Sequence, residues 1–256
     1  MVSIKSKREI ELMREPCKIV ALTHEMLEKN VKAGMSTYEI DKMAEEFIRA
    51  HGGEPSCKNY PSGVRGVPNF PAAVCISVND EVIHGIPSKD VIIKDGDLVS
   101  LDFTVYKNGF HGDAARTLMI GNVSDEAKKL VEVTKQSFFE AIKFAKKGYR
   151  IGDISHAVES YVKPYGYSVV REFQGHGIGR EMHEDPGIPN YGKPGKGLRL
   201  EPGMTLAIEP MVIDGAPDIL ELEDGWTIIT EDGSLAAHYE NTILITENEP
   251  NILTIL

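Results

Sequence analysis

The chain has 256 residues and a formal net charge of −11. Its length and its hydrophobic content of 41% suffice for one large domain or two small ones. The acidic balance and the absence of a basic block exclude nucleic acid as the main partner. No apolar run approaches the roughly 20 residues that cross a bilayer, and the charged start "MVSIKSKREI" does not predict a signal peptide. Three cysteines without a C-x-x-C spacing fit a reducing cytoplasm.

The first predicted elements are two helices. Apolar residues recur every three to four positions over about residues 5–29. A second helix starts at a Ser36/Thr37 cap and runs to about His51, where two glycines close it.

Residues 98–120, "LVSLDFTVYKNGFHGDAARTLMI", then predict two strands around a two-residue Asn108-Gly109 turn. A third helix is expected after Ser124 and ends near Lys147-Gly148, and a fourth covers about residues 153–163. The remainder alternates short β-rich runs with Gly/Pro turns.

An internal repeat relates two halves, about residues 5–120 and 121–250. "KAGMSTYEIDKMAEEFIRAHG" (32–52) aligns without a gap on "KKGYRIGDISHAVESYVKPYG" (146–166). Three further matches follow in the same order, and they place Asp102 on Glu209 and Asp113 on Glu240. The repeat predicts a single α+β domain over residues 1–256, built of two αα-ββ halves whose mainly antiparallel strands share a sheet covered on one face by helices.

The two aspartates of the hairpin are unusual, because Asp is depleted from strands. The Asn108-Gly109 turn pairs residue 104 with 113 and 102 with 115, so Asp102 and Asp113 share a face as diagonal neighbours, about 7–8 Å apart at Cα. Like charges at that range repel unless a cation lies between them. Since the repeat adds Glu209 and Glu240, we expect four carboxylates to converge on two divalent ions.

Histidine supplies nitrogen ligands to such sites. His176, in "GHGIG", is the best candidate, because nothing in the first half matches it. His84 and His183 match each other at the start of H-x-x-P turns, which suits contacts to the two ends of a substrate. His111 and His238 precede Asp113 and Glu240 by two residues, so each is equally consistent with a structural role and with a contact that orients a metal ligand. His24, His51 and His156 are interpreted as ordinary helix residues.

Several stretches together resemble the type I methionine aminopeptidases of bacteria, over about residues 3–248: "NDEVIHGIP", "LDFTVYKNGFHGDAART", "GHGIGREMHEDP", "MTLAIEPM", "DGWT" and "AAHYENTILIT". The resemblance implies the pita-bread fold with its pseudo-twofold duplication. It also implies hydrolytic removal of the initiator methionine from nascent chains whose second residue is small. Asp113 and Glu240 would bridge two ions (Co, Mn, Fe or Zn), Asp102 would chelate one of them, and His176 and Glu209 would bind the other.

The same resemblance assigns further roles. Glu209 would shuttle a proton, His183 would stabilise the developing oxyanion, and His84 would contact the scissile-bond nitrogen. The pocket for the methionine side chain would be formed by residues from both halves, namely Tyr60, Phe70, Cys75, Met182 and Trp226, with Cys57 near its rim. A monovalent cation near Asn79, a monomeric state and action at the ribosome in the cytoplasm are also implied.

One segment departs from the family pattern. Residues 61–69, "PSGVRGVPN", are a few residues longer than is usual, and Arg65 is interpreted as projecting towards the entrance of the site.

Three alternatives remain open from the residues. X-Pro-directed peptidases of the same fold usually carry a long N-terminal domain and further histidines. A non-catalytic relative would have lost ligands, whereas all five are intact. A carboxylate-rich metal store would leave the histidines without a role.

Overall fold

The computed structural model describes residues 2–256. Its four α-helices and one 3₁₀ turn are α1 (Lys7–Asn30), α2 (Thr37–Ala50), α3 (Asp125–Ile142), α4 (Ile151–Val162) and η1 (Lys163–Tyr165). Serine caps begin the first three: the hydroxyls of Ser6, Ser36 and Ser124 each accept a hydrogen bond from a backbone N–H of the first turn. None of the described helices combines the length and apolar content needed to cross a membrane.

The strands form four sheets in which every pair is antiparallel. The first half supplies one sheet, ordered β1 (Glu54–Pro55), β4 (Leu98–Lys107), β2 (Cys75–Val78), with β5 (Phe110–Met119) on the other edge of β4. The second half supplies a sheet ordered β15 (Asn251–Ile252), β14 (Asn241–Leu244), β9 (Thr205–Ile208), β7 (Gln174–Gly177), β8 (Glu184–Pro189).

Two three-stranded sheets complete the fold. One is ordered β13 (Ala236–His238), β10 (Met211–Ile213), β6 (Ser168–Val169). The other is ordered β11 (Ile219–Glu221), β12 (Ile228–Thr230), β3 (Glu81–Ile83), and so joins strands of both halves. The expected single shared sheet is therefore divided, although its antiparallel character is as predicted.

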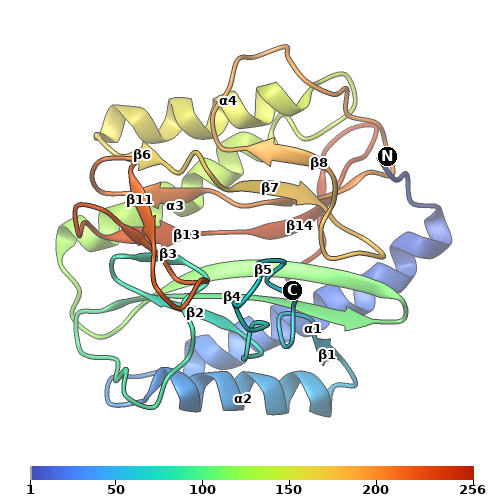
Figure 1. Ribbon diagram of the computed structural model, residues 1–256. Coiled ribbons are helices and arrows are strands. Elements are labelled where there is room, and N and C mark those ends of the chain that lie inside the picture. The colour runs from blue at the N-terminus through green and yellow to red at the C-terminus, as the bar shows by residue number, and fades with distance from the viewer. Residues whose placement is uncertain (1) are drawn as a thin grey trace.

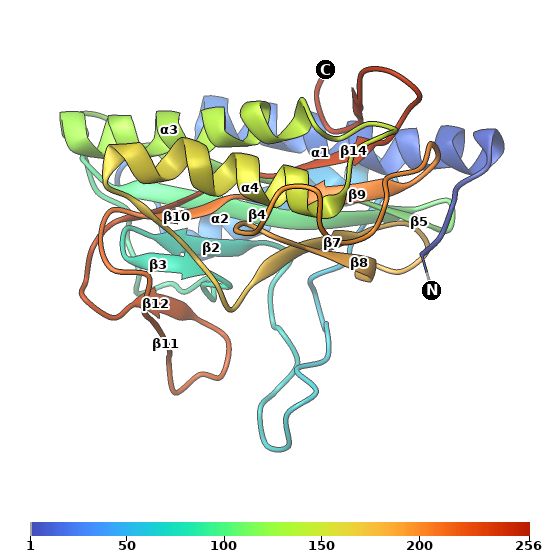
Figure 2. The same cartoon turned by 90° about the horizontal axis from the view of Figure 1, so that it is seen from above.

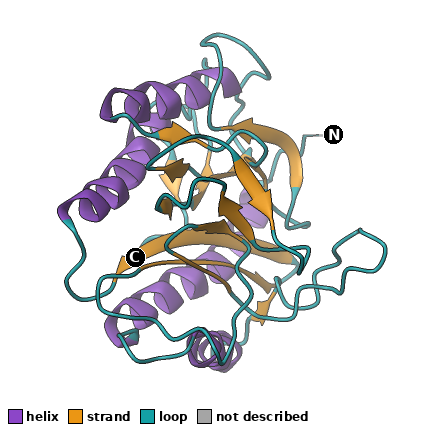
Figure 3. Cartoon of the chain, turned by 60° about the vertical axis from the view of Figure 1, so that its left-hand side comes forward, coloured by secondary structure: helices purple, strands orange, loops and turns teal. Residues whose placement is uncertain are grey.

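The elements are arranged in layers (Figure 1). Helices α1, α3 and α4 lie on one side of the strands, whereas hairpin β11–β12 and the loop of residues 61–69 extend from the other side (Figure 2). The same loop is the longest projection from the molecule in Figure 3. The helices thus cover one face of the sheets, as predicted.

The equivalence of α2 and α4 is visible in how each begins and ends. Gly34 and Gly148 precede them with φ of 93° and 96°, and Gly52 and Gly166 follow them with φ of 72° and 87°. A carboxylate in the first turn of each helix, Glu39 in one and Asp153 in the other, accepts from the backbone N–H of the N-cap residue at 2.8 Å. The aligned repeat therefore has matching local geometry, while the proposed boundaries of the two halves stay a prediction.

The ends of the two later helices differ from expectation. Helix α3 ends at Ile142, because Phe144 and Ala145 donate to carbonyls three residues back and Lys147 donates to Thr246 O, so the chain leaves the helix early. Helix α4 begins at Ile151, two residues before the expected start. The carboxylate of Asp153, in the first turn of the helix, accepts a hydrogen bond from the backbone N–H of Arg150 and so stabilises the earlier start.

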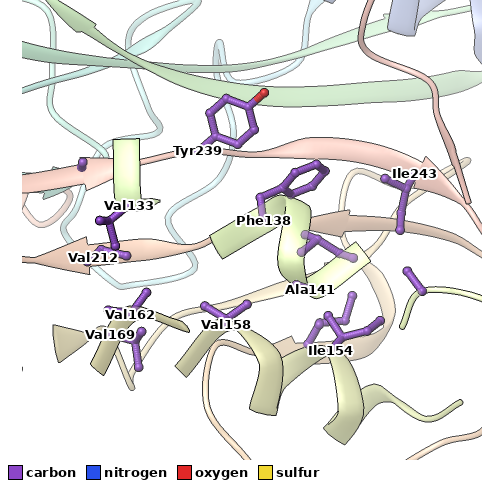
Figure 4. Packing of buried hydrophobic residues seen from close by; sticks show 14 of the residues in the cluster. Val133, Phe138, Ala141, Ile154, Val158, Val162, Val169, Val212, Tyr239 and Ile243 are labelled. Carbon is purple, nitrogen blue, oxygen red and sulfur yellow. The ribbon is translucent and has the colours of Figure 1, made fainter. Parts of the chain in front are cut away.

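Each half has its own hydrophobic core. Helices α3 and α4 pack Val133, Phe138, Ile154 and Val158 towards strand residues such as Val212, as Figure 4 shows. Helices α1 and α2 pack against β2 and β4 through a second cluster that includes Val20, Ile40, Ile48, Leu101 and Phe103. The packing of the two helix pairs on the sheets fixes the position of the strands that they cover, and these strands carry the candidate site.

Candidate metal centre and active site

The β4–β5 hairpin has the predicted register. Asp102 pairs with Ala115 and Thr104 with Asp113, and the turn residues have φ of 56° and 83°, which is the left-handed pair of a type I′ turn. Asp102 and Asp113 therefore lie on the same face. On the other edge of β4, Cys75 pairs with Asp102, which brings β2 beside the two carboxylates.

The second half supplies three more side chains from neighbouring strands. His176 lies on β7 opposite Ala207 of β9, and Ala207 also pairs with Thr242 of β14. Glu209 follows β9 directly and Glu240 directly precedes β14. Because Asn241 pairs with Ile208, continuation of this register puts Glu240 opposite Glu209.

Four of the five side chains lie close to one another, and Asp102 lines the same cavity. His176 Nε2 lies 3.9 Å from Asp113 Oδ2 and 3.6 Å from Glu209 Oε1. One ligand atom each from Asp113, His176 and Glu240 lie within 4.8 Å of one another. Asp113 and Glu240 are only 4% and 2% exposed, and their Oδ1 and Oε1 atoms have no hydrogen-bond partner among the described residues. Buried acceptors without donors, aimed at one space, fit a bound cation.

The electrostatics agree with that assignment. Burial raises the pKa of Asp102, Asp113, Glu209 and Glu240, and the charges of neighbouring carboxylates raise the pKa of all but Asp113 further. Four buried acids in one cavity resist ionisation unless positive charge compensates them. Burial lowers the pKa of His176 to about 4, so its ring is neutral, as a metal ligand must be. Its Nδ1 lies 2.8 Å from Gly177 O, which leaves Nε2 available.

The other two predicted histidines face the same space. Tyr60 Oη lies 2.7 Å from His183 Nδ1, and the rings of His183 and His176 meet edge-on at 4.4 Å. His84 has a left-handed backbone, φ 60°, and its ring meets Phe173 edge-on at 5.5 Å. Burial lowers the pKa of both His84 and His183 to about 4. Both therefore act as neutral hydrogen-bonding groups.

A cavity of about 640 Å³ connects these groups. All of the predicted metal, histidine and pocket residues line it: Cys57, Tyr60, Phe70, Cys75, His84, Asp102, Asp113, His176, Met182, His183, Glu209, Trp226 and Glu240. Trp226 and Phe70 pack edge-on at 5.3 Å, so one wall is aromatic.

Sequence reasoning missed some of the lining. Ile83, Thr104 and Phe173 contribute to the cavity, and none was singled out. Phe173 directly precedes the glycine-rich stretch that carries His176, and a large apolar residue beside small ones is a signal that could have identified it.

The remaining histidines differ in how close they lie to the candidate metal centre. His238 is 2% exposed, and its Nε2 lies 3.9 Å from Glu209 Oε2, behind the centre. His111 instead contacts Ser56 Oγ through Nδ1 at 3.0 Å and does not line the cavity. His24 was interpreted as an ordinary helix residue, but its Nε2 reaches 3.0 Å from Ala114 O, beside a ligand residue, from a fully buried position. The helical period alone did not reveal that role.

His51 and His156 are surface residues that contact the backbone carbonyls of Phe47 and Gly192.

The long loop of residues 61–69 packs beside the cavity. Trp226 Nε1 donates to Pro68 O at 2.9 Å, and Val67 packs on Gly225. Arg65 is exposed on this loop, and its approach to the entrance stays a prediction.

Comparisons with known proteins agree with this geometry. The model of metallopeptidase family M24 matches residues 11–247. A methionine aminopeptidase of Clostridium acetobutylicum is 51% identical, with 100% of this chain and 99% of that protein covered, and methionine aminopeptidase 1 of Bacillus subtilis is also 51% identical, with 99% of each covered. The crystal structure of a methionine aminopeptidase from Thermotoga maritima superposes with a TM-score of 0.96 at 43% identity, with 100% of both chains covered. The expected pita-bread fold is confirmed.

Proposed function

The chain belongs to metallopeptidase family M24, and we propose that it removes the N-terminal methionine from nascent polypeptides whose second residue is small. The reaction is a metal-dependent hydrolysis. The observation that carries the proposal is the convergence of four carboxyl groups and His176 at one cavity, whose wall also includes aromatic and sulfur-containing side chains.

Asp102, Asp113, His176, Glu209 and Glu240 would hold two divalent ions, with Asp113 and Glu240 shared between them. A set of carboxylate oxygens and one imidazole nitrogen suits Mn, Fe, Co or Zn. Such ions supply the Lewis acidity that makes water a nucleophile near neutral pH. The unpartnered oxygens of Asp113 and Glu240 support their role as shared ligands.

The chain's own groups handle the proton and the developing charge. Glu209 accepts the proton of the attacking water and returns it to the leaving amine. His183 stabilises the oxyanion, for which Nε2 must carry a proton. The Tyr60 hydroxyl supports that tautomer, because burial raises the pKa of Tyr60 and the phenol can donate to His183 Nδ1. His84, across the cavity, contacts the scissile-bond nitrogen.

Recognition of the methionine side chain falls to Phe70, Cys75, Met182 and Trp226, with Tyr60 and Cys57 near them. Apolar, polarisable walls suit an unbranched thioether. The preference for a small second residue rests on the resemblance to relatives.

We further propose that the protein is a cytoplasmic monomer acting on nascent chains at the ribosome, without direct binding to nucleic acid or membrane. A monovalent cation near Asn79 is part of the same proposal. These points rest on the resemblance to relatives and on the acidic charge of the chain.

Metal-depleted protein reconstituted with Mn²⁺, Co²⁺ or Fe²⁺ should release methionine from Met-Gly-Met-Met. Gly-Pro peptides should stay intact. No methionine release with any of these metals would contradict the proposal, and cleavage of Gly-Pro peptides would favour an X-Pro-directed peptidase instead.

A further inference from the structure

The C-terminal segment lies against the strand that follows Glu240. Strand β15 pairs with β14, with Ile252 opposite Ile243, and Leu253 N then donates to Thr242 O at 2.9 Å. The next link is made by a side chain: Thr242 N donates to Thr254 Oγ1 at 3.1 Å. Thr254 is 1% exposed. Its hydroxyl therefore takes the place of a ladder carbonyl.

The same hydroxyl reaches a second residue of β14. Thr254 Oγ1 donates to Asn241 Oδ1 at 3.0 Å, and Arg116 Nη2 donates to that oxygen at 2.7 Å. Arg116 Nη1 also donates to the carbonyls of Ala115 and Glu240, and Glu240 N donates to Ala115 O at 3.0 Å. The backbone of Glu240 is thus fixed on both sides, and Asn241 links it to the C-terminal segment.

Thr242 connects this arrangement to the hairpin. Its hydroxyl accepts from Asp113 N and donates to Asp113 O, both at 2.9 Å. The hydroxyl of Thr242 therefore holds β5 at Asp113 against β14, two residues after Glu240. Asp113 and Glu240 must keep their carboxylates within reach of the same ions, so the spacing of these two backbones decides the quality of the site.

We propose that Thr254 is a positioning residue for the metal centre, acting through Asn241 and Thr242 on the backbones of Glu240 and Asp113. The inference rests on the proposed function, in which those two residues are shared ligands. Without the Thr254 hydroxyl, the buried N–H of Thr242 has no acceptor. The Oδ1 atom of Asn241 then keeps only the hydrogen bond from Arg116. Asn241 and Thr242 are both 0% exposed, so water cannot replace the lost bonds.

The test is Mn²⁺ binding to metal-depleted protein, measured by titration calorimetry. Removal of partners that orient metal ligands weakens metal binding by about 10–100-fold, and since Thr254 acts one residue further out, we expect Thr254→Val to weaken it by about 5–10-fold. Thr254→Ser keeps the hydroxyl and should stay within about twofold, and Thr254→Cys, with a weaker acceptor, should fall between them. This order remains measurable even if the valine variant folds poorly.

Thr134→Val is the matched control. Thr134 is also 1% exposed and donates its hydroxyl to Leu130 O at 2.8 Å, but it lies on α3 away from the ligands. Its loss should lower stability without changing Mn²⁺ affinity, which separates positioning from general destabilisation.

A double mutant tests the route. If Thr254 acts in part through Thr242, the combination of Thr242→Val and Thr254→Val should weaken binding by clearly less than the product of the single effects. Wild-type affinity in Thr254→Val, or a drop matched by Thr134→Val, would overturn the inference. Failure of the wild type itself to bind Mn²⁺ would instead contradict the proposed function.

Discussion

Replacement of Asp113 by Asn should have opposite effects on stability with and without metal. The carboxyl is 4% exposed, and one of its oxygens has no hydrogen-bond partner among the described residues. With metal, Asp113→Asn removes what the proposed function makes a ligand of both ions, so it should abolish methionine release. Asp102→Asn is the matched change in the same hairpin, and we expect it to retain one ion, because the proposed function assigns Asp102 to a single metal.

The magnitude without metal follows from burial. A buried polar group without its partner costs about 1–3 kcal/mol. The Asn amide carries no charge and can donate to a neighbouring carboxylate, so it relieves both this cost and the repulsion between carboxylates. A domain of this size changes Tm by about 2–4 °C per kcal/mol. Metal-free Asp113→Asn should therefore melt about 2–12 °C above the metal-free wild type. With metal at a hundredfold excess over its Kd, the wild type gains about 2.7 kcal/mol that the variant lacks.

The pH dependence has a definite sign. Burial raises the pKa of Asp113, so the stability associated with the protonated form is complete at low pH and is lost as pH rises through that raised pKa. The advantage of metal-free Asp113→Asn should be larger at pH 7.5 than at pH 5. Differential scanning fluorimetry with and without Mn²⁺, combined with metal analysis, gives both readouts. A metal-free variant that melts below the wild type at pH 7.5 would refute the reasoning.

Three further outcomes are expected. Tyr60→Phe removes the donor to His183 Nδ1 and should lower kcat about tenfold with little change in KM or Tm; an unchanged kcat would argue against tautomer control. Burial would raise the pKa of Glu45, but hydrogen bonds from lysine and arginine neighbours lower that pKa to about 2. Glu45→Gln should therefore lower the free energy of unfolding in urea by about 1–2 kcal/mol at pH 7. This difference should shrink as the pH falls from about 4.5 towards 2, where the Glu45 carboxylate becomes protonated. Gly112→Ala would place Cβ 2.6 Å from Cys17 N and should destabilise by more than about 2 kcal/mol; a Tm equal to wild type would contradict this contact.

Local patterns in the sequence predicted where the candidate site residues would lie relative to one another, and the repeat predicted the fold class. The Asn108-Gly109 turn determines the hairpin register, and period-two alternation then places Asp102 and Asp113 on one face. The repeat predicted Glu209 and Glu240 as the counterparts of these two aspartates, and both line the same cavity. These inferences work because turn type and pleat are local properties of the chain.

What the sequence did not predict depends on contacts between distant segments. The division of the strands into four sheets follows from how the two halves meet, and no local pattern encodes it. The contact of His24 with Ala114 O requires α1 to lie on β5, and the early end of α3 depends on a bond to Thr246. The place of Phe173 at the cavity also depends on a contact between distant segments, because its ring packs against His84, which follows β3.

The order of the ligands along the chain has a consequence for biosynthesis. In the proposed function, Asp102 and Asp113 are ligands from the first half, whereas Glu240 and the proposed positioning residue Thr254 follow more than a hundred residues later. A chain still in synthesis can fold its first hairpin long before the remaining ligands exist. In the proposed function, metal binding and hydrolysis therefore arise together, once the strands of both halves have folded against each other.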